Sequence, residues 1–206
     1  MIVVHHLNDS RSQRVLWLLE ELAVPYEIRH YARDAKSRLA PPELLAVHPL
    51  GKSPVIEDGA QKVAESGAIV DYLIRHHGAG RLQPAAGTAD FEAYQQWLHY
   101  AEGSAMLPLM LKLYVGRLGD AGAPLAPRIR DELANHLGYV DRALQGHDWL
   151  VGEQLTGADI QMSFVGEAAR ELRASYPAMD VWVRRLQARP AYQRALQRGG
   201  PYALAG

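Results

Sequence analysis

Apolar residues near the start of the chain follow two different periods. Residues 2–7 form a short, mostly apolar run that predicts a strand. Residues 11–23 carry leucine and valine at helical spacing, and residues 26–31 alternate with a period of two, as a half-buried strand does. A helix of this length brings the chain back in its starting direction, so we expect the two strands to pair in parallel.

The next stretch predicts a short helix, a hairpin and a longer helix. Residues 39–46 contain two prolines that suit the first turn of a helix, and residues 54–64 read as two short strands joined by an Asp-Gly turn. A helix follows from about Ser66 and ends near Gly78, a residue type favoured at helix C-termini. The order β-α-β-α-β-β-α predicts an α/β, thioredoxin-like domain over residues 1–78.

The rest of the chain has helical periodicity only. Residues 79–88 are small and turn-rich, which predicts a linker, and residues 89–206 are expected to form an all-α domain. Pro108 falls within the first helix of this domain and predicts a kink there. Thr156 and Asp159 have the spacing of a capping box, so we expect a helix to start directly after Thr156.

Composition narrows the classes of function. Of the 206 residues, 48% are hydrophobic and 22% are charged, which is ordinary for a globular protein. The formal net charge of −1 provides no field that would favour nucleic acid or an anionic membrane. No apolar run is long enough to span a bilayer, and the start of the chain lacks a signal-peptide pattern, so we expect a cytoplasmic protein.

Two residue types decide what chemistry the chain can supply. The sequence has no cysteine, which excludes disulfides, cysteine zinc ligands and a thiol nucleophile borne by the protein. None of the nine histidines has the spacing of a zinc or facial-triad site, and we therefore expect no metal.

Five short stretches form a recognisable pattern when they are taken in order and at their spacings. They are residues 8–22 (NDSRSQRVLWLLEEL), 48–56 (HPLGKSPVI), 65–69 (ESGAI), 155–160 (LTGADI) and 189–192 (RPAY). Together they resemble a bacterial, serine-type member of the cytosolic glutathione transferase superfamily, of the theta/phi-like or fungal type. The resemblance covers essentially the whole chain and implies that the first domain holds glutathione and the helical domain holds a second substrate.

The resemblance also implies a residue that activates the glutathione thiol. Ser10, just before the first helix, takes this role, and its hydroxyl and the positive end of the helix would both favour thiolate over thiol. Ser12 is the main alternative, and a plain helix-capping role for Ser10 also fits its position. Tyr26 and Tyr31 lie in the second strand, which disfavours a tyrosine-type enzyme.

The remaining glutathione contacts follow from the same resemblance. Ser53 and Pro54 stand where the fold carries a cis-proline, which would turn the Ser53 backbone towards the cysteinyl backbone of glutathione. Ser66 and the helix N-terminus would bind the γ-glutamyl carboxylate, and Glu65 would face the ammonium group. Lys52 would meet the glycyl carboxylate or only solvent.

For the second substrate, the resemblance points to an apolar pocket near Pro108, with Met106, Met110 and Tyr114 as candidates and core packing as the alternative for each. The expected activity is conjugation of glutathione to small hydrophobic electrophiles, together with peroxide reduction. The alternatives are a glutathione-dependent isomerase or dehalogenase and a non-catalytic interaction protein with the same fold. The resemblance further implies a homodimer.

Overall fold

A computed structural model describes residues 1–205, which form two compact units. One unit contains Met1–Gln83 together with the chain from Leu186 onward, and the other contains Pro84–Arg185. The boundary falls inside the segment 79–88 that the sequence predicts as a linker. The sequence predicts that residues 89–206 form the helical domain, whereas in the structure the chain from Leu186 onward packs with the first unit.

The first unit is built on a four-stranded sheet. Its strands are β1 (Ile2–Leu7), β2 (Tyr26–Tyr31), β3 (Val55–Asp58) and β4 (Gln61–Ala64), in the spatial order β2-β1-β3-β4. Strands β1 and β2 are parallel, and β1–β3 and β3–β4 are antiparallel. The predicted parallel pair and the predicted hairpin are therefore confirmed, and the sheet is thioredoxin-like.

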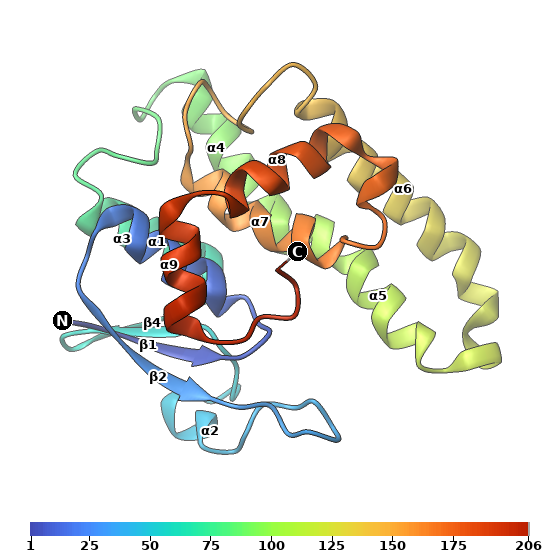
Figure 1. Cartoon of the computed structure of the whole chain (residues 1–206), viewed down its shortest axis with the longest axis horizontal. Helices are drawn as coiled ribbons and strands as arrows, with labels where there is room; N and C mark the ends of the chain where they lie inside the picture. The colour runs from blue at the N-terminus through green and yellow to red at the C-terminus, as the bar shows by residue number, and fades with distance from the viewer. Residues whose placement is uncertain (206) are drawn as a thin grey trace. The chain divides into compact units, whose positions relative to one another are not determined.

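Four helices complete this unit. They are α1 (Ser12–Leu22), α2 (Leu44–Val47), α3 (Ser66–His77) and α9 (Pro190–Gly199). Helices α1, α3 and α9 lie on one side of the sheet, and α2 lies on the other (Figure 1). The short helix predicted within residues 39–46 forms as α2, which begins at Leu44, just after the two prolines.

Helix α9 packs along α1 within the first unit. The rings of Trp17 and Tyr192 meet edge to face, with centroids 5.4 Å apart. The Glu20 carboxylate accepts hydrogen bonds from Arg194 at 2.8 Å and Arg198 at 3.0 Å. An aromatic contact and a charged cluster thus attach the last helix to the thioredoxin-like domain.

The second unit is helical. Its helices are α4 (Ala89–Tyr100), a π-helical turn (Ala101–Ala105), α5 (Met106–Gly116), a 3₁₀ segment (Gly119–Leu125), α6 (Ala126–Ala143), α7 (Gly157–Ala168), a 3₁₀ turn (Arg173–Ser175) and the start of α8 (Pro177–Gln187). The break predicted at Pro108 appears as the π-helical turn just before it. Pro108 cannot donate to the carbonyl four residues earlier and its ring crowds that carbonyl, so the widened turn accommodates it.

Helix α7 starts where the sequence predicted. The Thr156 hydroxyl accepts from the Ala158 amide at 3.2 Å, and the Asp159 carboxylate accepts from the Thr156 amide at 3.0 Å. The Thr156 side chain also accepts from the backbone of Asp159, which completes the capping box.

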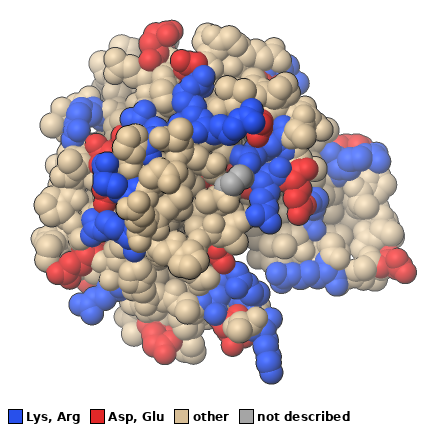
Figure 2. All heavy atoms as spheres, in the orientation of Figure 1, with Lys and Arg blue, Asp and Glu red and all other residues tan. Residues whose placement is uncertain are grey.

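On the face shown in Figure 2, basic and acidic side chains are interspersed rather than gathered into one field of a single sign. Within residues 1–205, no helix combines the length and the apolar character that crossing a membrane requires.

Candidate functional site

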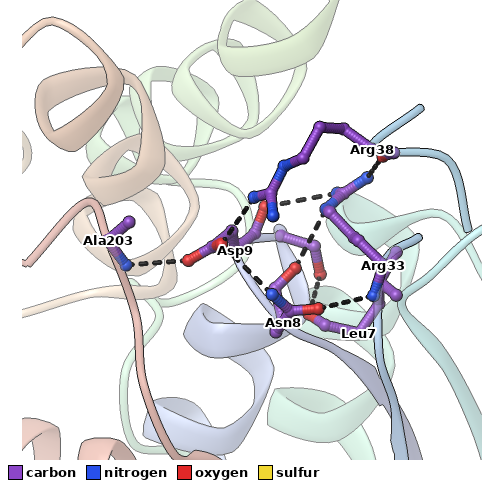
Figure 3. A network of polar contacts seen from close by, with 7 residues as sticks. Leu7, Asn8, Asp9, Arg33, Arg38 and Ala203 are labelled. Carbon is purple, nitrogen blue, oxygen red and sulfur yellow. Dashed lines mark hydrogen bonds and ion pairs between the residues drawn. The ribbon is translucent and has the colours of Figure 1, made fainter. Parts of the chain in front are cut away.

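The loop between β1 and α1 is held in a fixed conformation by a polar network around Asp9, which Figure 3 shows from close by. Asp9 has a φ of +51°, a value that aspartate tolerates better than most residues. Its carboxylate accepts from Arg38 at 2.8 Å and from the Ala203 amide at 2.7 Å. Arg33 donates to the carbonyl of Asn8 at 3.0 Å. Two chain segments that are far apart in sequence, residues 33–38 and the chain at Ala203, therefore position the residue directly before Ser10.

Ser10 lies between the end of β1 and the start of α1. It is 4% exposed, and its hydroxyl oxygen lies 2.7 Å from the Leu7 carbonyl and 2.7 Å from the Ser12 hydroxyl. The Ser12 amide donates to it at 3.2 Å. The Ser10 hydroxyl therefore accepts from the amide of the first residue of α1 and lies where the positive end of the helix dipole acts.

Ser12 occupies a different environment. Its side chain is 0% exposed, and its hydroxyl contacts Nδ1 of His6 at 2.8 Å. His6 is also buried, at 3% exposure, and its Nε2 contacts the Gly199 carbonyl at 3.1 Å. Both serines are therefore buried, and Ser12 differs from Ser10 in that its hydroxyl contacts a buried imidazole.

Ser53 and Pro54 lie beside this loop. The peptide bond between them is cis, as predicted. The Ser53 hydroxyl donates to the His5 carbonyl at 2.8 Å and accepts from the Leu7 amide at 3.2 Å. Since Ser10 contacts the carbonyl of the same Leu7, the end of β1 brings Ser10 and Ser53 together.

The N-terminus of α3 carries two further predicted residues. Glu65 is exposed and has a φ of +67°, which is uncommon for a residue other than glycine and is a recognised feature of binding sites. Ser66 is buried, and its hydroxyl accepts a hydrogen bond from Arg14 of α1. Arg14 thus links α3 to the helix that begins beside Ser10. Lys52 is exposed.

Burial of His6 makes the stability of the first unit depend on pH. Burial, with the neighbouring His30, lowers the pKa of His6 from its usual 6.5 to about 4. The native state therefore binds fewer protons than the unfolded state between these values, and the free energy of unfolding falls as the pH is lowered from 6.5 to 4. A shift of this size corresponds to about 3 kcal/mol.

We expect urea denaturation at pH 7 and pH 4.5 to show this loss in the wild-type protein. In His6→Phe the difference between the two pH values should be smaller, because no imidazole is left to protonate at this site. His99→Phe, on an exposed position of α4, is the matched control and should keep the wild-type difference. An unchanged pH dependence in His6→Phe would contradict this assignment.

The three residues predicted for the second substrate have different surroundings in the helical unit. Met106 is buried, Met110 is half-buried and Tyr114 is 55% exposed. The guanidinium of Arg117 lies 5.8 Å from the centre of the Tyr114 ring. Met106 is therefore part of the packed core, and Met110 and Tyr114 keep surface available for contacts.

The helical unit also contains a mainly apolar cavity of about 430 Å³. It lies between α5, the 3₁₀ segment and α6, and its lining includes Val115, Ile129, Leu133, Leu172 and Tyr176. None of the three predicted pocket residues lines it. Among residues 1–205, no group of three or more histidine, aspartate or glutamate side chains is arranged to hold a metal ion.

Comparison with known proteins decides the family. Residues 1–75 match the N-terminal domain of glutathione S-transferase, and residues 103–190 match the C-terminal domain of glutathione S-transferase. The chain belongs to the glutathione S-transferase family. Glutathione S-transferase 3 of Schizosaccharomyces pombe is 35% identical to it over 215 residues, which cover 96% of this chain and 88% of the relative.

Solved structures agree with this membership. The crystal structure of a glutathione S-transferase from Actinobacillus pleuropneumoniae superimposes with a TM-score of 0.91 at 35% identity, covering 99% of this chain and 95% of the other. A glutathione transferase family member from Pseudomonas fluorescens, solved with two glutathione bound, superimposes with a TM-score of 0.79 at 30% identity, covering 95% and 92%. The predicted two-domain glutathione transferase fold is thereby confirmed.

In this family member, the sequence did not single out His6 or the residues that hold the Ser10 loop. His6 is one of the nine histidines whose spacing does not suggest a metal site. The signal that could have found it is the period of the first strand, because Ile2, Val4 and His6 share one face and the two others are apolar core residues. A polar side chain on such a face needs a buried partner.

Proposed function

We propose that this protein conjugates the glutathione thiolate to small hydrophobic electrophiles, and that the same thiolate serves in peroxide reduction. The observation that supports this most is the convergence of Ser10 and Ser53 at the end of β1. A hydroxyl, a helix N-terminus and the backbone around a cis-proline occur there together. Such a site suits a ligand with a peptide backbone and an ionisable thiol.

The other ligand groups fit residues of the same unit. The γ-glutamyl carboxylate would bind at the N-terminus of α3 with the Ser66 hydroxyl, and the ammonium group would face the Glu65 carboxylate. Lys52 is exposed and free to reach the glycyl carboxylate. In the helical unit, Met110 and Tyr114 keep part of their surface open, and we propose them as contacts for the electrophile.

The effect of a lowered thiol pKa on the reaction rate can be estimated. If the thiol pKa falls by about two units from roughly 8.5, the thiolate fraction at neutral pH rises about 25-fold. Nucleophilicity falls along with the pKa, at a Brønsted slope of roughly 0.4–0.5, and cancels about a factor of eight. The net gain is only about threefold, so positioning of the two substrates must supply most of the rate enhancement.

Ser10→Ala is expected to move the pH profile of kcat/KM to higher pH by about one unit, because one hydrogen bond to the thiolate is lost. The rate should fall about three- to fivefold at pH 6 and change little at pH 8, since the less stabilised thiolate is also the better nucleophile. Steady-state kinetics with glutathione and an activated aryl halide measure this profile.

The KM for glutathione should stay within about twofold of wild type in Ser10→Ala, since the backbone and carboxylate contacts remain. Ser37→Ala, at an exposed serine outside the site, is the matched control. A Ser10→Ala profile that coincides with wild type would show that another group activates the thiol. Absence of turnover in the wild type with aryl halides, enones and peroxides would contradict the proposed activity.

We further propose a cytoplasmic homodimer. The connection from β2 to β3 exposes three leucine side chains in the first unit, Leu39, Leu45 and Leu50. Exposed apolar side chains gathered on one segment are typical of a protein–protein contact.

A further inference from the structure

Four groups form a continuous chain of hydrogen bonds behind Ser10. It runs from the Gly199 carbonyl to His6, then to Ser12 and finally to Ser10. The Gly199 carbonyl can only accept, so the proton of a neutral His6 lies on Nε2. Nδ1 of His6 is then an acceptor only.

This tautomer limits the directions in which the hydroxyl protons of Ser12 and Ser10 can point. Because Nδ1 of His6 accepts at 2.8 Å, the Ser12 hydroxyl donates to it and has no proton left for Ser10. The Ser10 hydroxyl proton then lies towards the Ser12 oxygen or the Leu7 carbonyl, each at 2.7 Å. In both arrangements the proton points into the protein.

We propose that His6 and Ser12 are positioning residues that hold the Ser10 proton away from the glutathione sulfur, so that Ser10 meets the thiol as an acceptor and must be released before it can donate to the thiolate. The proposal rests on the proposed function, since it concerns the thiol site of Ser10. It gives the buried Ser12 a role other than that of an alternative activating hydroxyl.

The surroundings of His6 keep this arrangement in place. His30 approaches the His6 ring edge to face at 5.7 Å, and both its charge and burial oppose protonation of His6. The Gly199 carbonyl and the more distant Asp9 favour protonation but are outweighed, and His6 stays neutral at pH 7. Ser10 is therefore held in the accepting arrangement at that pH.

Release of Ser10 requires its hydroxyl to turn away from the Ser12 oxygen and the Leu7 carbonyl. Because Ser12 donates to His6, its oxygen faces Ser10 as an acceptor, and losing that contact opposes the turn. The cost of breaking the hydrogen bond behind Ser10 therefore offsets part of the stabilisation that its hydroxyl gives to a thiolate.

Two substitutions should reduce that opposition. Ser12→Ala removes one of the two acceptors of the Ser10 proton and leaves the Leu7 carbonyl, and His6→Phe leaves the Ser12 hydroxyl free to donate to Ser10 instead of accepting from it. In each variant the bound glutathione thiolate should appear at a pH about half a unit to one unit lower than in wild type. A variant damaged only in packing would bind glutathione less tightly or shift the thiolate to higher pH, so the direction of the shift distinguishes the two explanations.

The thiolate is read from its ultraviolet absorbance across pH in the full chain with saturating glutathione, for wild type, Ser12→Ala, His6→Phe and Ser10→Ala/Ser12→Ala. The double variant should match Ser10→Ala, because Ser12 acts only through Ser10. Histidine ¹⁵N spectra of the ligand-free wild type at pH 7 give the His6 tautomer without any ligand and should show protonated Nε2 and bare Nδ1.

A His6 that carries its proton on Nδ1, or on both nitrogens, overturns the proposal, and so does a thiolate that appears at the wild-type pH or higher in both single variants. An effect of Ser12→Ala that persists without Ser10 also overturns it. If Ser10→Ala shifts the thiolate in these experiments while the His6 and Ser12 variants do not, the proposed function stands and only this inference fails. Failure of the wild type to bind glutathione would contradict both the proposed function and the inference about His6 and Ser12.

Discussion

Replacement of Asp159 by alanine is expected to lower the free energy of unfolding of the helical unit by about 3–5 kcal/mol. The carboxylate is 0% exposed and accepts from the Leu150 amide at 2.9 Å, the Thr156 amide at 3.0 Å and the Trp182 indole at 3.0 Å. Burial raises the pKa of Asp159, and these donors oppose that shift. Alanine would leave all of them buried without an acceptor, which costs more than the lost bonds themselves.

Urea denaturation followed by circular dichroism at pH 7 measures this loss. Asp131→Ala, whose side chain is exposed on α6 and paired with Arg130, is the matched control and should cost less than about 0.5 kcal/mol. Asp159→Asn keeps one acceptor and should fall between alanine and wild type. Equal stabilities for the two alanine variants would show that the capping box and the Trp182 contact contribute little.

Glu65→Gln is expected to weaken glutathione binding by at least about tenfold. The substitution preserves the size of the side chain but removes the negative charge proposed to face the γ-glutamyl ammonium, and a hydrogen bond to a charged group is worth roughly 1.5–3 kcal/mol. Calorimetric titration with glutathione measures the change in Kd. The pH at which the bound thiolate appears should not move, because the γ-glutamyl ammonium that Glu65 would face is remote from the sulfur of the central cysteinyl residue.

Glu27→Gln tests whether the effect is local. Glu27 is exposed on the edge strand β2, and its substitution makes the same change of charge. Binding by Glu27→Gln should equal that of the wild type. A similar loss in both variants would indicate a general electrostatic effect, and an unchanged Kd in Glu65→Gln would remove Glu65 from the site.

The sheet, its helices and the capping box could be predicted because each depends on local signals. Period-two and helical spacing fix the type of element, and Thr156 with Asp159 fixes a helix start. The placement of α9 could not be predicted in this way. An amphipathic helix shows that one face is buried but not against which partner, and the pairing of Glu20 with Arg194 and Arg198 joins residues more than 170 positions apart.

In the candidate site, too, some residues could be predicted from the sequence and others could not. Ser10, Ser53 and Glu65 could be named because they belong to contiguous motifs of the family. Their supports could not, since Arg14 reaches Ser66 on another helix and His6 reaches Gly199 near the other end of the chain. Such long-range contacts depend on the packing of α1 against α3 and α9, which no local pattern encodes.

The most direct test of the central claim is a single titration of the wild-type protein with glutathione, followed by calorimetry and by the ultraviolet absorbance of the thiolate across pH. We expect saturable binding below millimolar glutathione and a bound thiol that ionises well below its usual pKa of roughly 8.5. No binding at millimolar glutathione, or a bound thiol that ionises at its usual pKa, would contradict it.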